Sequence, residues 1–518
     1  MATLSFVKKH RAHITGQLSC FDRVIFKGYL PFCQPGAMEA FLWAKGVLLK
    51  DFKSFVVAKS EAVKQHALAI AQKAKRPYVY LNRANRKEEE VAAILQRDRI
   101  TEGLVCVLGT IEQSPSFKLR YGEGRPKLIQ AYPRCLCLYF YFIDRRYGLM
   151  HVRLQTWLPF TIQVYLNGHE WLARQLDRHQ VGYQRLDNAF IQLADPVRAQ
   201  RFADRLPHQN WPRVLGALAR RANPHLGDLL DGLSYYWVID QAEYSTDILF
   251  EDRAALKGLY AQLLRHATVC FSAEDVMTFL GRKLNGNFQG EVLTDYKHRW
   301  PGARVKHRLK GNWIKMYDKH GCVLRIETVI NQPYEFRVRR QGMREGQKVT
   351  GWFPMAKGVA NAYRYAEVAQ AANFRYLEAL SVVDDPANAY RLLDRLCEPV
   401  TRHQKRFRAL NPLRRSEVGL FASVLRGEHF IHGFRNRDVA AGIGLAPAPD
   451  LATRKRRSAC VSRKLQLLRA HGLIAKVPNA RRYRLTLCGA TLMTAAVLLR
   501  QQELPARLNT QLDNSPHD

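Results

Sequence analysis

The chain has 518 residues, of which 47% are hydrophobic and 24% charged, and it carries a net charge of +36 at pH 7. This length predicts roughly three or four domains, and the hydrophobic content excludes a disordered basic chain. Because the sequence lacks an apolar run of about 18 residues and a signal peptide, we expect a cytoplasmic protein whose partner is a polyanion and not a membrane.

The fold class that the patterns predict is α+β multidomain. Residues 1–130 alternate strand and helix signals, in FDRVIFKGYLPF, AMEAFLWAKGVLL, SEAVKQHALAIAQKAKR, PYVYLNR and GLVCVLGTI, and predict a mixed α/β region. Residues 131–230 predict a β-meander followed by helices. In the meander strand LMHVRLQTW, apolar residues alternate with His151, Arg153 and Gln155, which predicts one polar, basic face.

The second half of the chain continues this alternation. Residues 231–345 predict a mixed α+β core, because aromatic and β-branched segments flank two helical stretches. Residues 346–400 have helical spacing and predict a helical connector. A basic stretch near Thr401 marks the start of a C-terminal domain over 401–502, and the polar tail 503–518 predicts disorder.

Carboxylates and basic side chains of the central core are the first candidates for chemistry. Glu243 and Asp247 are four residues apart in an apolar segment, on one face of either a strand or a helix, and buried carboxylates are costly unless paired or bound to a metal. Alternation places Tyr317 and Lys319 on one face of the strand segment KMYDK. It places Arg325 and Glu327 on one face of the next strand segment, VLRIETVI. Such a surface suits a metal-assisted phosphodiester reaction, with carboxylates holding Mg²⁺ or Mn²⁺.

The order of the acidic strand, K-x-Y-D-K and R-I-E resembles the core of rolling-circle plasmid and phage replication initiators. The resemblance implies metal ligands at Glu243, Asp247 and Glu327, and a nucleophile at Tyr317 or Tyr296. Glu243 stands where these proteins usually have Asp, and the His-hydrophobic-His motif of the endonuclease versions is missing.

Structural roles for the same residues are the alternative. The carboxylates at 240, 243 and 247 could form salt bridges with some of the 81 basic residues, and Tyr317 could be an ordinary strand aromatic. The segment Asp318–Gly321 predicts a hairpin turn, and Asn167 predicts a helix cap. The ten cysteines lack a CxxC pair, which predicts buried free thiols.

Residues 401–500 contain 21 Lys and Arg against 4 acidic residues, a net +17 of the chain's +36. Three helical stretches precede a hairpin with a turn at Asn479–Ala480, and SRKLQLLRAHGLIAKVPNARRYRLTLCG resembles the recognition helix and wing of bacterial winged-helix DNA-binding proteins. The resemblance implies base contacts from Ser462, Arg463 and Gln466. It implies phosphate contacts from six basic residues: Arg456, Arg457, Lys464, Arg481, Arg482 and Arg484.

The whole chain is also similar to a large bacterial family built around phrases such as SCFDRVIFKGYLP and IKMYDKHGCVLRIET, from which no activity carries over. Three hypotheses remain: a metal-dependent DNA-nicking, replication or mobile-element protein; a non-enzymatic DNA-binding regulator; and an RNA-binding partner of a structured RNA. The remaining net charge of +19, outside the C-terminal segment, indicates that nucleic acid contacts more of the chain than this segment alone. We expect DNA to be the partner before RNA. The sequence predicts no oligomeric state.

Overall fold

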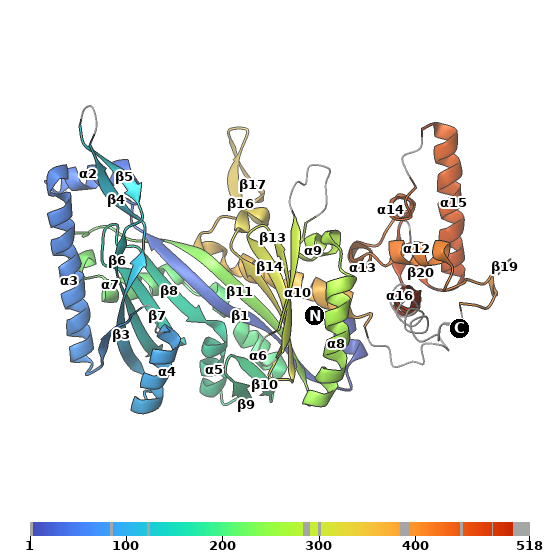
Figure 1. The fold of residues 1–518 in the computed structure, drawn as a ribbon, viewed down its shortest axis with the longest axis horizontal. Helices are drawn as coiled ribbons and strands as arrows, with labels where there is room; N and C mark the ends of the chain where they lie inside the picture. Colours follow the sequence, from blue (N-terminus) through green and yellow to red (C-terminus); the bar gives the residue numbers. More distant parts are fainter. Residues whose placement is uncertain are drawn as a thin grey trace, which may run out of the picture. The chain divides into compact units, whose positions relative to one another are not determined.

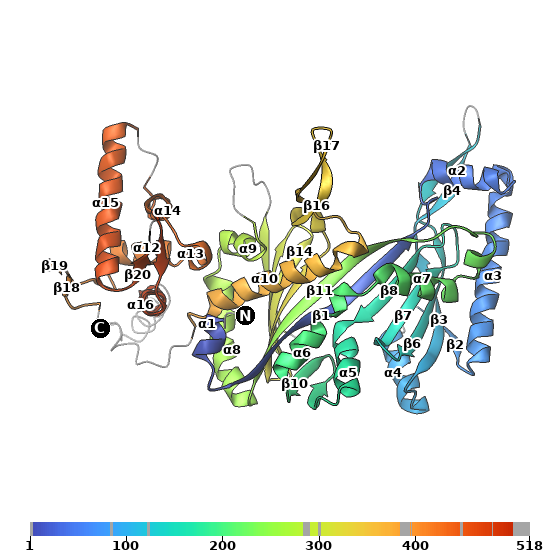
Figure 2. The same cartoon turned by 180° about the vertical axis from the view of Figure 1, so that it is seen from behind.

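The structure is a computed structural model that describes residues 4–82, 86–121, 125–282, 291–298, 302–383, 394, 396–402, 404–445, 449–478 and 480–500. Helices and a large mixed sheet make up the described part, which confirms the α+β class (Figure 1, and from behind in Figure 2). The chain divides into two compact units. Unit 1 comprises Met1–Thr15, Phe250–Ile326 and Ala371–Asp518, and unit 2 comprises Gly16–Leu249 and Glu327–Gln370.

Unit 2 contains the residues of the predicted N-terminal region and meander. Its helices are α2 (Pro35–Ala44), α3 (Phe52–Lys73), α4 (Lys87–Asp98), α5 (Gly168–Arg178), α6 (Pro196–Ala203), α7 (Trp211–Ala222) and the start of α10 (Ala362–Leu380). Short 3₁₀ turns lie at η1 (Leu49–Asp51), η2 (Leu206–His208), η3 (Pro224–Gly227), η4 (Pro333–Glu335) and η5 (Val359–Asn361).

The strands of unit 2 are β1 (Ile14–Tyr29), β2 (Tyr78–Tyr80), β3 (Gly103–Gln113), β4 (Ser116–Arg120), β5 (Lys127–Ala131), β6 (Arg134–Asp144), β7 (Gly148–Gln155), β8 (Ile162–Asn167), β9 (Tyr183–Leu186), β10 (Ala189–Leu193), β11 (Tyr236–Phe250), the end of β15 (Val323–Ile330), β16 (Arg337–Arg344) and β17 (Gln347–Pro354). The main sheet has the order β15-β11-β1-β8-β7-β6-β3-β2. Strands β2 and β3 are parallel, whereas β6, β7 and β8 form the predicted antiparallel meander. The segment 346–400 differs from the predicted connector, since it begins with β17 before α10.

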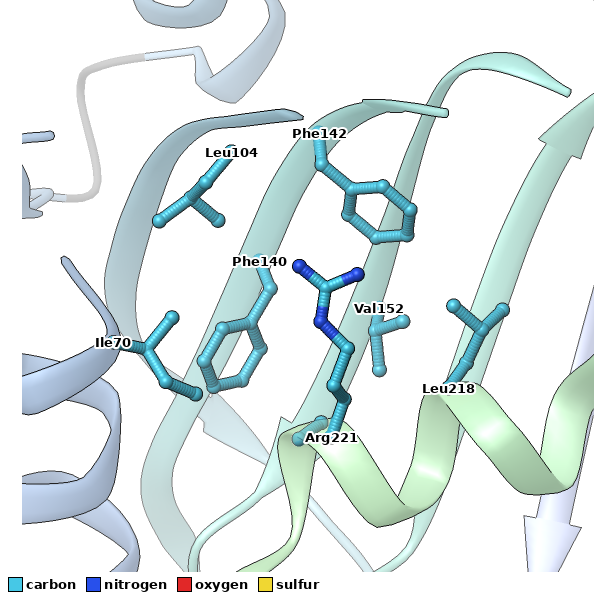
Figure 3. A pocket seen from close by; sticks show the side chains of 8 residues that line it. Ile70, Leu104, Phe140, Phe142, Val152, Leu218 and Arg221 are labelled. Carbon is cyan, nitrogen blue, oxygen red and sulfur yellow. The ribbon is translucent and has the colours of Figure 1, made fainter. Parts of the chain in front are cut away.

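One face of this sheet is apolar and packs against α3 and α7. Phe140, Phe142 and Val152 face Ile70 of α3 and Leu218 of α7 (Figure 3). The side chain of Arg221 also lies here, with its guanidinium carbon 5.8 Å from the centre of the Phe142 ring. The cavity that remains has a volume of about 30 Å³, which has room for water but not for a ligand.

The opposite face carries the polar residues of β7, as the alternation predicts, and it is largely covered. Arg153 is 8% exposed and Gln155 is fully buried. The Arg153 guanidinium donates to Glu112 at 2.9 Å and to the hydroxyl of Ser114 at 3.0 Å, so its charge is satisfied inside the protein. Helix α4 covers part of this face.

Unit 1 consists of two sets of elements. The first set is α1 (Ser5–Lys9), α8 (Arg253–Val269), α9 (Ala273–Phe279), β12 (Val292–His298), β13 (Ala303–Leu309), β14 (Asn312–Lys319) and the first half of β15, and its strands lie side by side in chain order. The predicted turn at Asp318–Gly321 is confirmed: His320 and Gly321 both have positive φ, and the Gly321 amide donates to Asp318 at 2.8 Å.

The second set is the C-terminal segment. It contains β18 (Val400–Arg402), β19 (Lys405–Phe407), α12 (Arg415–Val424), α13 (Gly427–His432), α14 (Asn436–Gly442), α15 (Leu451–Ala470), β20 (Ile474–Lys476), β21 (Tyr483–Leu485) and α16 (Leu487–Leu498). Leu420, Phe434, Val461, Leu465 and Met493 belong to one buried core. Asn479 of the expected turn and the tail 503–518 lie outside the described residues.

The described residues contain no helix that combines the length and apolarity needed to cross a membrane. All ten cysteines are free thiols, as predicted, but the expectation that they are buried holds for only four of them: Cys33 and Cys322 are partly exposed, and Cys270, Cys397, Cys460 and Cys488 are exposed.

Candidate functional site

Three carboxylates from different strands of unit 2 meet inside the protein. Asp22 lies on β1, Glu243 on β11 and Glu327 on β15, and one oxygen from each lies within 4.8 Å of the others. Their exposed fractions are only 8%, 5% and 1%. We call this group the carboxylate triad. Because β15, β11 and β1 are neighbours in the sheet, residues far apart in the sequence become adjacent.

The spacing of the triad suits a hard divalent cation. Oxygens on opposite sides of one Mg²⁺ are about 4.2 Å apart, and around Ca²⁺ about 5 Å, so ligand atoms within 4.8 Å can close on one ion after small movements. Like charges at this distance repel strongly in a buried site, and a divalent cation would offset that repulsion. Carboxylate oxygens are also the donors that Mg²⁺ and Mn²⁺ prefer.

Asp247 does not belong to the triad, which corrects the expectation that it shares a metal with Glu243. The segment is a strand, and four residues of strand span about 13 Å, too far for two carboxylates to reach one ion. Asp247 instead lies 3.6 Å from Nε2 of His169, whose Nδ1 is 3.2 Å from the Asp22 carboxylate. His169 therefore sits between Asp247 and the triad, and both His169 and Asp247 are fully buried.

Polar side chains around the triad fix its carboxylates. Arg23 donates to Glu243 at 2.5 Å, and Gln241 donates to the same oxygen at 2.6 Å. Burial lowers the pKa of Arg23, but the negative charge of Glu243 outweighs this effect and leaves the pKa above its ordinary value. The amide of Asn188 donates to Asp22. These contacts hold two triad carboxylates in place without any added ion.

The start of α5 brings His169 against β1. The side chain of Asn167 accepts hydrogen bonds from the amides of His169 at 2.8 Å and Glu170 at 3.1 Å, which confirms it as the helix cap. Gly168 permits the close approach, because a Cβ at this position would lie 2.0 Å from the carbonyl oxygen of Phe21. The backbone here therefore requires glycine for His169 to reach Asp22.

The pKa of Tyr165 on β8 responds to the charges of the triad. Burial raises its pKa, and the negative charges of Asp22 and Glu243 raise it further, so its hydroxyl stays protonated at neutral pH. It neighbours Ile25 of β1 in the sheet register.

The four residues proposed from the sequence as catalytic belong to unit 1. Tyr296 on β12 is 46% exposed, whereas Tyr317 and Lys319 on β14 are half-buried. The Arg325 side chain on β15 has no exposed surface. Glu243 and Glu327, the proposed ligands that do meet, are both in unit 2.

All nine proposed nucleic-acid contacts are at least partly exposed. On α15 these are Arg456, Arg457, Ser462, Arg463, Lys464 and Gln466, and beside the hairpin they are Arg481, Arg482 and Arg484. Several have partners within the protein: the hydroxyl of Ser462 accepts from Asn436 at 2.8 Å, Arg482 donates to the carbonyl of His432 at 2.8 Å, and Arg463 donates to the carbonyl of Ala459 at 3.4 Å. The C-terminal segment thus presents these side chains on its surface.

A second, partly buried ionic network lies on the polar face of the sheet. Glu112 accepts from Lys87 at 2.8 Å, from Arg153 at 2.9 Å and from Tyr139 at 2.7 Å. Burial raises the pKa of Glu112, but these partners lower it more, to about 2. The network therefore contributes stability that is complete above the ordinary pKa of 4.5 and is lost as the pH falls towards 2.

We expect Glu112→Gln to lower the stability of the protein by about 2 kcal/mol at pH 7, after allowing for solvent screening. The difference in unfolding midpoint between variant and wild type should shrink as the pH falls from 4.5 towards 2, because Glu112 takes up a proton below about 4.5 in the unfolded chain but only near 2 in the folded protein. Thermal unfolding followed by circular dichroism at several pH values measures this. Glu89→Gln, at a side chain that is 71% exposed, is the control and should change little at any pH.

Asp22 was not predicted from the sequence, although one signal was present. It is the acidic residue within the apolar strand segment CFDRVIF, just as Glu243 is within its own apolar strand. Nothing in the linear order indicates that β1 and β11 are neighbours, however, so the two could not be grouped. Comparison with protein-family models, with curated proteins and with solved structures found no match to this chain.

Proposed function

We propose that this protein binds DNA through its C-terminal segment and cleaves or transfers a DNA phosphodiester bond at the carboxylate triad, with Mg²⁺ or Mn²⁺ as cofactor. One observation carries the proposal: Asp22, Glu243 and Glu327 converge from three neighbouring strands in a buried site. Buried carboxylates that converge in this way are more typical of a functional site than of a hydrophobic core.

The bound cation would neutralise charge on the phosphate and stabilise the transition state. The protein's own residues would orient the site: Arg23 and Gln241 hold Glu243, while Asn188 and His169 hold Asp22. In the reaction, an oxygen nucleophile forms a bond to phosphorus and loses its proton, while the phosphorus–oxygen bond to the leaving strand breaks and that oxygen takes up a proton. The nucleophile is a water or, as the resemblance to replication initiators implies, a tyrosine such as Tyr296 or Tyr317.

The arrangement of the C-terminal segment supports a winged-helix assignment. Helices α12, α14 and α15 share one core, and β20 and β21 form an antiparallel hairpin directly after α15. Phe434, between α13 and α14, pairs with Tyr483 of the hairpin through two backbone hydrogen bonds of 2.9 and 2.8 Å. Three helices with a small sheet formed in this order are the elements of a winged helix, in which α15 would enter the major groove.

The charge of α15 supports nucleic acid as its partner. Its buried residues are Val461, Leu465, Leu468 and Ala470, all in its second half. The first half contains four consecutive basic residues, 454–457, and packs no buried side chain into the core. This half of the helix is therefore available to phosphates, with Arg456 and Arg457 among the proposed contacts.

The test is to incubate purified protein with labelled single- and double-stranded DNA in Mn²⁺, Mg²⁺ or EDTA. We expect metal-dependent cleavage, and a protein–DNA adduct that survives denaturation if a tyrosine is the nucleophile. An adduct lost in Tyr317→Phe or Tyr296→Phe would identify that tyrosine, and cleavage without an adduct would identify water. Tight DNA binding without cleavage in either metal would contradict the enzymatic part and favour a non-enzymatic binding protein.

A further inference from the structure

A cavity of about 470 Å³ lies on the polar face of the unit 2 sheet, between the strands and α4. Its volume is in the range of small-molecule and nucleotide sites. The α4 side contributes Val91, Ala92 and Leu95, and the sheet side contributes aromatic and polar residues of β1, β6, β7 and β8. It is therefore a different space from the small apolar cavity of Figure 3, which lies on the other face.

An aromatic row forms the sheet side of this pocket. Tyr141, His151 and Tyr165 occupy directly opposed positions on β6, β7 and β8. The rings of His151 and Tyr165 are parallel within 2°, with centres 5.0 Å apart, and those of His151 and Tyr141 are 4.7 Å apart. Burial, with help from Lys87 and Arg153, lowers the pKa of His151 to about 3, so the row is uncharged at neutral pH.

The charges at the pocket favour a neutral aromatic ligand over a cation or a free anion. Three charged residues line the pocket, and the two positive ones, Arg23 and Lys87, outnumber Glu88, which disfavours a cationic guest despite the aromatic rings. Each is already ion-paired, Arg23 with Glu243 and Lys87 with Glu112, so little uncompensated positive charge is left for a phosphate. Gln163 also lines the pocket and offers an amide donor and acceptor for the edge of a heterocycle.

The pocket adjoins the carboxylate triad. Arg23 belongs to both, because it lines the pocket and donates to Glu243. Tyr165, at the end of the aromatic row nearest β1, has its pKa raised by the charges of Asp22 and Glu243. A planar group against Tyr165 would consequently share the pocket with Arg23, the residue that holds Glu243 of the triad.

We propose that this pocket binds one unstacked nucleobase of a single-stranded nucleic acid, against Tyr165 and beside the carboxylate triad. Aromatic side chains bind bases by stacking without strong sequence preference, and Gln163 would add a contact to the base edge. The inference rests on the proposed function for its choice of ligand. It adds that the substrate is single-stranded, or locally unpaired, at the reacting nucleotide.

The test uses single-stranded oligonucleotides carrying one 2-aminopurine, whose fluorescence is quenched by stacking, together with the free 2-aminopurine nucleotide. Binding is measured in EDTA, so it does not depend on cleavage. We expect quenching in wild type, and at least about tenfold weaker binding in Tyr165→Ala. Ala92→Phe, which places a ring in the pocket and removes no core residue, should weaken binding equally if the pocket is the site.

Tyr165→Phe keeps the ring and should bind within about twofold of wild type, and Tyr132→Ala, at an aromatic 60% exposed elsewhere in unit 2, is the matched control. Quenching by the oligonucleotide but not by the free nucleotide identifies a base within a strand as the ligand, and quenching by both identifies the base itself as sufficient. Quenching that Tyr165→Ala and Ala92→Phe leave unchanged overturns the proposal. Base binding that persists when cleavage is never detected overturns the proposed function and leaves the pocket assignment intact.

Discussion

Glu243→Gln and Glu327→Gln should each reduce metal-dependent DNA cleavage by at least about 100-fold while leaving DNA affinity within about twofold. Glutamine keeps the size of the side chain but removes the negative charge that a hard cation requires. The rate constant for cleavage in saturating Mn²⁺, measured with excess protein in a single turnover, isolates this step from substrate binding.

The matched control lies on the same strand as Glu243. Asp240 is partly exposed, lies 3.7 Å from Lys357 and does not belong to the triad, so Asp240→Asn should cleave at the wild-type rate. If Asp240→Asn and Glu327→Gln lose activity to the same extent, the effect is one of strand stability and the triad is not the reaction centre. Undiminished cleavage in both triad variants would contradict the site outright.

Replacing Arg456, Arg457 and Lys464 together with alanine should weaken binding to DNA on the order of 100-fold at 0.1 M salt. Each phosphate contact contributes about 0.9 to the slope of log affinity against log salt concentration, so the slope should fall by about 2.7. Fluorescence anisotropy across a salt series gives both quantities. The loss should be uniform across DNA sequences, because these residues are assigned to the backbone.

A control that removes two positive charges from another part of the protein separates specific contacts from net charge. Arg86 and Arg97 are exposed but lie beside acidic partners, Glu89 and Asp98, so their joint replacement by alanine should leave the slope unchanged within about 0.5. An equal fall in slope for the two sets of variants would mean that the whole charge of the protein, and not α15, carries the binding.

The sequence predicted local elements well and long-range pairing poorly. In residues 1–130 the five segments quoted as strand or helix signals correspond to β1, α2, α3, β2 and β3. Hydrophobic periodicity and turn residues are local signals, and here they agree with the tertiary packing. Gly472, for example, has a φ of +74° directly after α15, a conformation typical of the glycine that ends a helix.

The candidate site was predicted only in part, because its members come from strands that are distant in sequence. Glu243 and Glu327 were predicted from the apolar residues around them in the sequence, because a buried carboxylate is unfavourable unless it is paired or binds a metal. Asp22 could be added only once β1 is known to lie beside β11. Asp247 was included because four residues separate it from Glu243, a spacing that brings side chains together on a helix but not on a strand.

The alternation of apolar and polar residues likewise could not predict which polar residues are buried. The pattern in β7 correctly separated two faces, but it could not show that α4 and the Glu112 network cover the polar one. The aromatic row depends on the same pairing of β6, β7 and β8, and no local motif marks it.

The central claim is that the triad holds a divalent cation, and Mn²⁺ binding tests it most directly. Electron paramagnetic resonance of free Mn²⁺, titrated with protein in the absence of DNA, counts bound ions without any need for activity. We predict one bound ion per chain in wild type and in Asp240→Asn, and at least about tenfold weaker binding in Asp22→Asn and Glu327→Gln, with all four proteins folded by circular dichroism. Equal Mn²⁺ binding by wild type and both triad variants, or none by wild type at millimolar Mn²⁺, would contradict the claim.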